Sequence, residues 1–200
     1  MGTGDLYRGN SQEDDIEMVN ANTTLEHIQQ RSSIRRYERT PLTYYEITKL
    51  KKAVLAAPTA RDLQELRYYF VTDQSVLKQI DECIFRHASC ETRQQMISRG
   101  TDSFFYNAPL AVIITAKNTR WADADAGIAI GILSIAAQSM GLGSVILGFP
   151  AQGFIEGDPD NCCKLLRFEE GEQFRLAIAI GHPATQKEPH KQNPDLIRDI

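Results

Sequence analysis

The sequence predicts an α+β fold, in which helices cover a β-sheet. Segments with helical and with strand patterning alternate along the chain, but at irregular spacing and without the regular βαβ units of a parallel sheet. Two architectures stay open on this evidence: a segregated α+β fold, or a mixed sheet with helices on both sides. The chain has 200 residues, 42% of them hydrophobic and 24% charged, which suits one domain with some additional chain.

The domain boundary is predicted near Thr23. Residues 1–22 are polar and acidic, include Glu13-Asp14-Asp15 and have no hydrophobic period, so we expect a flexible acidic N-terminal tail before a single domain at 23–200. The first residues lack the basic start and apolar run of a signal peptide. No uncharged apolar stretch reaches the ~18 residues that a membrane span needs. We therefore expect a cytoplasmic protein with no membrane contact.

Charge and cysteine content exclude two further classes. The net charge of -4 argues against a general nucleic-acid-binding protein, although a small local basic site stays open. The four cysteines are Cys83, Cys90 and the adjacent pair Cys162-Cys163, and no CxxC spacing is present. Ordinary reduced thiols are expected rather than a disulfide framework or a zinc site.

Two helices are predicted in the first quarter of the domain. Thr23 begins a helix that ends near Gln30, because a glutamate follows the threonine at capping-box spacing. The second helix is better marked, since Thr43 is followed by Glu46 at the same spacing and by apolar residues on one face. It ends before Pro58, because a residue that precedes proline avoids helical angles.

The middle of the chain predicts two strands and a helix. Tyr68–Val71 is aromatic and β-branched, which is typical of a strand, and the apolar run Ala111–Ile114 predicts a buried one. Ser75–Phe85 has the apolar spacing of a helix. Residues 86–103 are polar and fit either a helix or a lid.

A helix from Asp125 to Met140 is strongly predicted, and it is rich in small residues. Glycine costs ~1 kcal/mol relative to alanine inside a helix. Gly127 and Gly131 therefore indicate that another backbone packs closely against this helix. That backbone belongs either to the same domain or to a second subunit, and both alternatives stay open.

The last quarter predicts alternating short elements. Ser144–Gly148 is strand-like and leads into a loop, and a short helix is expected at 163–166. Arg175–Ile180 reads as a fully buried strand, and the three prolines of the C-terminal stretch predict an extended arm or tail.

No motif in the chain supplies its own catalytic group. The sequence lacks a phosphate loop, a GxGxxG fingerprint, an HExxH pair, a nucleophile elbow and a carboxylate cluster. The four histidines are scattered and have no paired partner. Either the protein is not an enzyme or a cofactor carries the chemistry.

The best positive signal is Arg31-Ser32-Ser33-Ile34-Arg35. Arginine donates several hydrogen bonds to one phosphate, and the hydroxyls between the two arginines add further donors. If this segment sits at a helix end, both guanidinium groups can converge on one anion. The alternative is a solvated basic patch.

Two further segments could contact a flat ligand. The loop Ala57–Gln64 is rich in hydrogen-bonding side chains that suit a polyol and a ring edge, although its Asp62 and Thr59 could merely cap the local backbone. Gly141–Gly148 is glycine-rich, which lets backbone amides approach a planar ring. A helix C-cap followed by a core strand explains much of the same segment.

Together and in this order, these segments resemble the nitroreductase family of flavin enzymes. Residues 31–35 resemble its RRSxR-type phosphate motif, and 57–70 resemble its APSxxNxQPWxF loop and strand. The small-residue helix with the GLGS turn and the late strand with its G-x-P turn are also similar. The resemblance covers roughly residues 24–195.

The resemblance implies a mixed, mainly antiparallel sheet flanked by helices, in an intertwined homodimer that binds FMN at its interface. No metal is implied, and no side chain is assigned a catalytic role, because FMN carries the chemistry. The residues that match the phosphate and ribityl contacts of the family are Arg31, Ser32, Ser33 and Arg35. Those that match its contacts from the partner subunit are Pro58, Thr59, Ala60, Asp62 and Gln64. Those that match its ring contacts are Ile146, Leu147 and Gly148, and the basic residues that would close on the phosphate are Lys187 and Lys191.

The activity implied is transfer of a hydride from NAD(P)H, through FMN, to a nitroaromatic, a quinone or a similar small molecule, by a ping-pong mechanism. Two alternatives stay open: a flavin-binding protein without nitroreductase turnover, used in storage, sensing or flavin breakdown, and an interaction protein without flavin. The sequence departs from the family pattern at Asp62, where asparagine is usual, and at Glu65-Leu66, where proline-tryptophan is usual. We expect FMN binding to survive these changes and the flavin potential and substrate choice to change.

Overall fold

The computed structural model describes residues 22–200, so the predicted acidic tail lies outside the described residues except for Asn22. Its centre is a sheet with strand order β1-β2-β4-β3. The strands are β1 (Arg67–Val71), β2 (Leu110–Lys117), β3 (Gly143–Leu147) and β4 (Glu172–Gly181). All three neighbouring pairs are antiparallel, and a single-residue parallel bridge joins Ser33 to Ser144. The predicted α+β class is correct.

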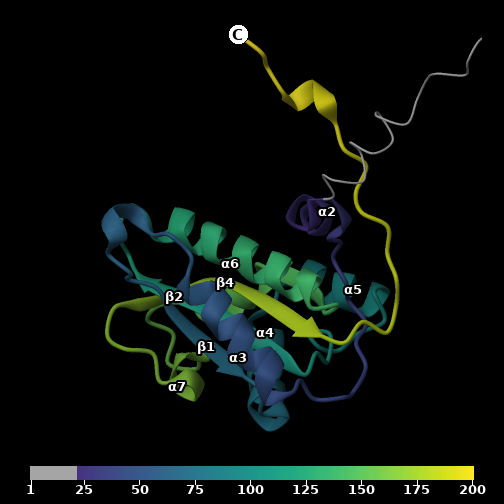
Figure 1. Ribbon diagram of the computed structural model, residues 1–200. Helices are drawn as coiled ribbons and strands as arrows, with labels where there is room; N and C mark the ends of the chain where they lie inside the picture. Colours follow the sequence, from purple (N-terminus) through teal and green to yellow (C-terminus); the bar gives the residue numbers. More distant parts are fainter. Residues whose placement is uncertain (1–21) are drawn as a thin grey trace, which may run out of the picture.

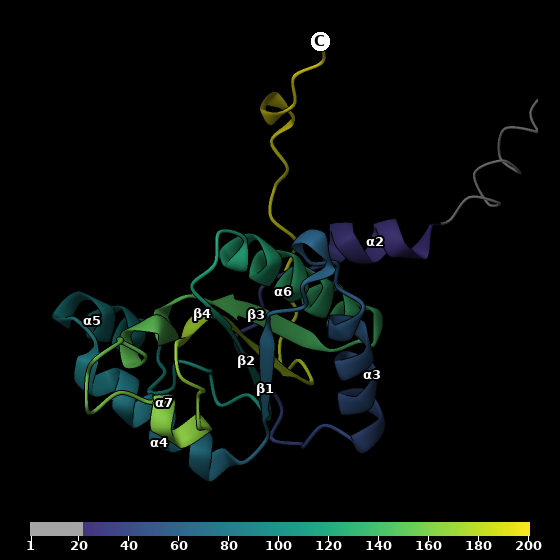
Figure 2. The same ribbon diagram turned by 90° about the vertical axis from the view of Figure 1, so that its left-hand side faces the viewer.

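Helices cover both faces of this sheet, so the domain has three layers (Figures 1 and 2). The helices are α2 (Thr23–Gln30), α3 (Tyr44–Leu55), α4 (Gln74–His87), α5 (Cys90–Ser98), α6 (Ala122–Ser139) and α7 (Cys163–Leu166). Three 3-10 turns complete the fold: η1 (Ala60–Asp62), η2 (Phe149–Gly153) and η3 (Pro194–Leu196). Helices α3 and α6 pack on one face, and α4, with α5 and α7 near it, lies on the other (Figure 2).

The central strands are apolar on both faces because each face has its own helix layer. Along β4, Ala177 and Ala179 join the core under α4, while Ile178 and Ile180 join the core under α3 and α6. Side chains alternate between the faces of a strand, so a doubly covered strand reads as a continuous apolar run. This is why the sequence of β4 predicted a fully buried strand.

Two predicted helix starts are corrected by the structure, and a helix is found in one stretch that the sequence left open. The N-cap of α2 is Asn22 rather than Thr23, because the Asn22 side chain accepts hydrogen bonds from the Thr24 and Leu25 N–H groups. Helix α6 begins at Ala122, three residues before Asp125, and its preceding residue, Trp121, makes no side-chain cap. Within the ambiguous stretch 86–103, residues Cys90–Ser98 form helix α5. The capping box of Thr43 and Glu46 is present as predicted.

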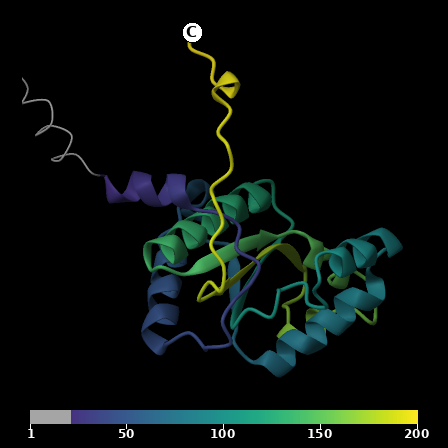
Figure 3. The same cartoon turned by 90° about the vertical axis from the view of Figure 1, so that its right-hand side faces the viewer.

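Beyond β4 the chain runs along the body and then extends away from it, as the yellow segment in Figure 3 shows. This agrees with the predicted extended arm. Every residue from Gln186 to Ile200 is exposed. These include the apolar side chains of Leu196 and Ile197 at η3. The arm therefore leaves apolar side chains uncovered by the rest of the described chain.

Candidate functional site

The Arg31–Arg35 segment lies in extended conformation beside the edge strand β3. Ser33 forms the bridge to Ser144, and the Ile34 N–H donates to the Ser144 carbonyl oxygen at 2.9 Å. Ser32 and Ile34 are both 8% exposed, whereas Arg31 and Ser33 are partly exposed and Arg35 is exposed. An extended chain alternates its side chains, so Arg31, Ser33 and Arg35 share the outward side.

The segment starts at a helix end, as the hypothesis of two converging arginines requires, and then runs beside β3. Arg31 is the C-cap residue of α2, and the segment after it forms an isolated parallel bridge at Ser33 rather than a helical turn. The side-chain period is therefore two, and Ser33 is brought to the same face as the arginines.

Gly143 allows the Arg31–Arg35 segment to lie close to β3. A Cβ atom at Gly143 would lie 2.9 Å from the Cβ of Ile34, which is too close for any side chain. The glycine of the GLGS turn thus has a packing role toward the Arg31–Arg35 segment. Two of the three candidate segments are joined at this point.

Along β3 only alternate residues face outward. Ile146 is 41% exposed and Gly148 is also exposed, but Leu147 is 5% exposed and packs in the core under α4. The Leu147 side chain is consequently not available to a ligand on the outer side. Because the Ser144 carbonyl points outward to Ile34, the backbone of Ile146 lies on that same outer edge.

Two residues that the sequence analysis did not single out, Arg99 and Tyr106, extend this surface. The Arg35 guanidinium lies over the Tyr106 ring, 5.9 Å from its centroid, and Arg99 Nη1 donates to the Tyr106 hydroxyl at 3.0 Å. Arg99 also lies 5.6 Å from the ring centroid of Phe149, which follows β3. Tyr106 and Asn107 both have positive φ angles, of 56° and 53°, an uncommon conformation that concentrates at functional sites. No spacing in the sequence links these residues to Arg35.

The loop 58–64 is built around a buried carboxylate at the start of α6. Asp125 is 6% exposed, and its side chain accepts a hydrogen bond from the Ala60 N–H at 3.0 Å. The Gln64 N–H donates to Thr59 Oγ1 at 3.0 Å, and Gln64 Nε2 donates to the Asp62 carboxylate at 2.8 Å. Residues 61–64 are exposed, so their side chains project from the body. The alternative that Thr59 caps local backbone is therefore correct for its hydroxyl.

One chain does not gather all the predicted residues. The loop 58–64 is fixed at the first turn of α6, while the Arg31–Arg35 segment lies beside β3, which follows the last turn of α6 (Figure 1). Helix α6 has 18 residues, and at 1.5 Å per residue it is ~27 Å long. The two sets of residues are separated by this length in a single chain.

The glycines of α6 are not packed against their own chain. A Cβ atom at Gly127 or at Gly131 would meet nothing within 4 Å, and the neighbouring Ile128 is 43% exposed. Of the two alternatives for these glycines, close packing within the same domain is therefore wrong for the described residues.

The two basic residues after β4 have different surroundings. Lys187 lines a cavity of about 460 Å³ together with Ser32 and Gly143. Lys191 is exposed and does not line this cavity.

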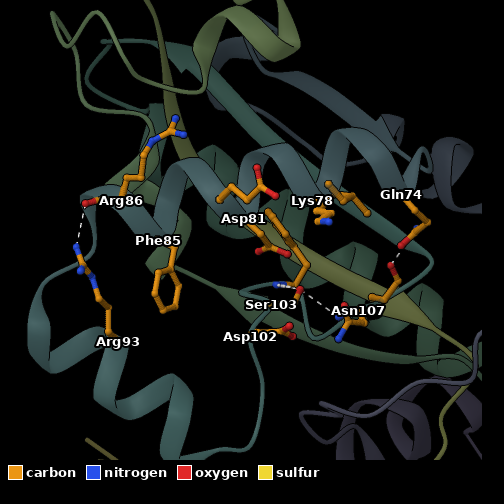
Figure 4. Close-up of a pocket in the computed structure, with 13 residues that line it drawn as sticks. Gln74, Lys78, Asp81, Phe85, Arg86, Arg93, Asp102, Ser103 and Asn107 are labelled. Carbon is orange, nitrogen blue, oxygen red and sulfur yellow. Dashed lines mark hydrogen bonds between the residues drawn. The ribbon is translucent and has the colours of Figure 1, made fainter.

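Two larger cavities are lined in part by the residues that lead into β2. One, of about 1150 Å³, extends from Arg35 and Arg99 to the start of α3. The other, of about 870 Å³, lies between α4, α5 and residues 102–108 and is shown in Figure 4. In it, the Asp81 carboxylate accepts a hydrogen bond from the Phe104 N–H at 2.8 Å, and burial raises the pKa of Asp81 to about 6.

The described residues hold free cysteines and neither a metal-ligand cluster nor a membrane-spanning helix. All four cysteines are free thiols, as predicted, and burial raises the pKa of the Cys162 thiol. Between residues 22 and 200, no group of three or more His, Cys, Asp or Glu side chains gathers as a metal site. In that same part of the chain, no helix combines the length and apolar character required to span a bilayer.

The chain combines a three-layer α+β fold with a basic, serine-containing segment against the edge strand β3. A family model described as "Nitroreductase family" matches residues 28–182, and the chain belongs to that family. The resemblance stated from the sequence is thereby confirmed.

Named relatives and solved structures support this assignment. An NADH dehydrogenase from Thermus thermophilus is 26% identical, with 82% of this chain and 88% of the relative covered. An FMN reductase (NAD(P)H) from Bacillus subtilis is 25% identical, with 82% and 67% covered. A nitroreductase with bound FMN from Desulfitobacterium hafniense has a TM-score of 0.83 at 23% identity and covers 90% of this chain and 100% of its own. At that identity the structural likeness establishes the fold.

Proposed function

We propose that this protein is an FMN-dependent oxidoreductase that takes hydride from NAD(P)H and reduces a nitroaromatic, a quinone or a similar small molecule. The observation that carries the proposal is the joining of Arg31–Arg35 to β3 at Ser33 and Ser144. This junction places donors suited to a phosphate next to the exposed backbone edge of a strand. The names of the relatives support the same activity.

The residues present fit FMN. Arg31, Ser33 and Arg35 share one outward face, and their guanidinium and hydroxyl groups suit a phosphate dianion and its ribityl chain. The outer backbone edge at Ile146 and Gly148 offers N–H groups to a ring, while Leu147 supports that edge from the core. Ser32 and Lys187 would contribute from the adjoining cavity, and Lys191 would do so from the arm.

The site needs a second copy of the chain. Pro58, Thr59, Ala60, Asp62 and Gln64 would meet the flavin only if another protomer brought them across the length of α6. The small-residue face around Gly127 and Gly131 has open space beside both Cβ positions, and it suits packing of two such helices because glycine lets backbones approach closely. A two-fold homodimer with two equivalent sites accounts for both observations.

FMN, when bound, supplies the hydride chemistry that no side chain of this protein supplies. The chain binds the phosphate, orients the ring on β3 and places the Arg35 and Arg99 guanidinium groups on the same surface, where they would favour negative charge. We propose that reductant and acceptor occupy one site in turn, which is a ping-pong order.

The test begins with the visible spectrum of the purified protein. We expect a yellow protein with a flavin-to-protein ratio near one per chain, and an Arg35→Ala variant that retains much less flavin. A matched Arg120→Ala variant, which removes an exposed arginine near Trp121, should keep its flavin. A wild-type preparation that is colourless and takes up no added FMN would overturn the proposal.

A second candidate has a specific observation in its favour. Asp62 and Glu65-Leu66 replace the usual residues of the family loop, and Leu66 is 6% exposed in the core rather than available to a ligand. A flavin-binding protein without nitroreductase turnover would tolerate such changes. Steady-state NAD(P)H oxidation with a quinone or a nitroaromatic separates the two, because the second candidate predicts flavin binding without turnover.

A further inference from the structure

The largest of the described cavities is lined by more basic than acidic side chains. Its volume is about 1150 Å³, and four arginines line it: Arg35, Arg36, Arg39 and Arg99. The carboxylate in its lining is Asp102. An excess of guanidinium groups around one hollow attracts an anion with several charges.

None of these arginines is neutralised by the part of the chain that the structure describes. The ion pairs found there are His87–Asp158, Arg175–Asp123 and His182–Glu46, so no carboxylate lies within 4.0 Å of any of the four guanidinium groups. Arg35 and Arg99 are instead held by Tyr106, through its ring face and its hydroxyl. Because Arg35 is assigned to the FMN phosphate, the guanidinium groups of Arg36, Arg39 and Arg99 stay available for a second anionic ligand.

The rest of the lining suits an aromatic base rather than a bare ion. Pro41, Leu42 and Ile47 form an apolar wall where the chain enters α3, and Leu42 is 8% exposed. Thr72 and Gln74 add hydrogen-bonding groups to the lining. The volume of about 1150 Å³ is slightly above the roughly 300–1,000 Å³ typical of small-molecule sites and far exceeds that of one phosphate.

We infer that this cavity binds the adenosine end of the reducing dinucleotide and selects NADPH over NADH. This inference rests on the proposed function, and it names the reductant that the function leaves open. NADPH carries a 2′-phosphate and a pyrophosphate, which match several arginines, and its adenine suits the apolar wall. Arg35 belongs both to this cavity and to the segment beside β3, so the cavity adjoins the proposed flavin site.

The kinetic test compares both nicotinamides on the FMN-loaded protein. We expect wild-type kcat/KM for NADPH to exceed that for NADH by about tenfold or more, since charge-assisted arginine–phosphate bonds are strong. The double variant Arg36→Ala/Arg39→Ala should lower this ratio by about tenfold. The control Lys49→Ala/Lys52→Ala removes two positive charges from the exposed surface of α3 and should leave the ratio unchanged. An equal ratio in wild type and the arginine double variant would overturn the inference.

A binding test does not require turnover. Calorimetric titration of the purified protein with adenosine 2′,5′-bisphosphate should show binding that is at least tenfold weaker in the arginine double variant. Adenosine 5′-monophosphate should bind the wild type more weakly than the bisphosphate, and equal affinity contradicts selection of NADPH. If the protein lacks flavin and oxidises neither nicotinamide, the proposed function fails, while bisphosphate binding that depends on Arg36 and Arg39 still supports the anion site.

Discussion

Asp62 replaces the asparagine of the family pattern, and its carboxylate accepts a hydrogen bond from the Gln64 side chain. An exposed negative charge that a partner protomer brings to a flavin disfavours the negatively charged reduced ring. A charge interaction of about 1 kcal/mol corresponds to about 20 mV for a two-electron couple. We expect Asp62→Asn to raise the flavin potential by about this amount while leaving FMN retention nearly unchanged, as redox titration of both proteins would show. Equal potentials would contradict this role.

Asp81 predicts a pH dependence of stability. Burial raises the pKa of Asp81 from 3.8 to about 6, so the folded protein favours the protonated carboxyl. The stability that this group contributes is present below about pH 4 and is lost as the pH rises through about 6. Two pKa units correspond to about 2–3 kcal/mol.

The variant Asp81→Asn should therefore flatten the pH profile. We expect the free energy of unfolding of the wild type to fall between pH 4 and 7 relative to the variant, measured by urea denaturation at each pH. Glu82→Gln, an exposed change on the same helix, is the control and should follow the wild type. Parallel profiles for wild type and Asp81→Asn would show that this carboxyl is not the titrating group.

At the scale of elements, the contact between the Arg31–Arg35 segment and β3 is the critical one. A Cβ atom at Gly143 would lie 2.9 Å from Ile34, so Gly143→Ala forces the two segments apart. Overpacking of this kind costs about 1–3 kcal/mol. We expect a lower melting temperature and a reduced flavin-to-protein ratio. Gln94→Ala, an exposed change on α5, is the control and should keep both properties, and a Gly143→Ala protein with wild-type flavin content would contradict the prediction.

Capping motifs predicted the start of a helix correctly where both of their hydrogen bonds are formed. Thr43 and Glu46 form both hydrogen bonds of a capping box, and α3 begins where they predict. Thr23 and Glu26 have the same spacing, but the asparagine one residue earlier caps α2 instead. Trp121 carries no side-chain cap, so the first turn of α6 has no sequence signal and the predicted start falls three residues late.

At the scale of the whole molecule, α6 is the predicted contact between protomers. Gly131→Arg should leave the monomer folded, because its Cβ position is open, and should prevent two helices from approaching. We expect a dimer for the wild type and a flavin-poor monomer for the variant by analytical ultracentrifugation. Gln94→Arg on the exposed surface of α5 should stay dimeric. A dimeric Gly131→Arg protein with full flavin content would place the interface elsewhere.

The sequence by itself determined the α+β class, most elements and the candidate segments at 31–35, 57–64 and 141–148, because each is encoded by neighbouring residues. Only the tertiary structure shows that Ser33 pairs with Ser144 and that the Leu147 side chain is buried in the core. It also shows that Arg99 and Tyr106 lie beside Arg35. It also separated the loop 58–64 from Arg35 by the length of α6. The physical reason is range: capping and side-chain periodicity act within a few residues, whereas strand pairing and packing join positions that no spacing in the sequence connects.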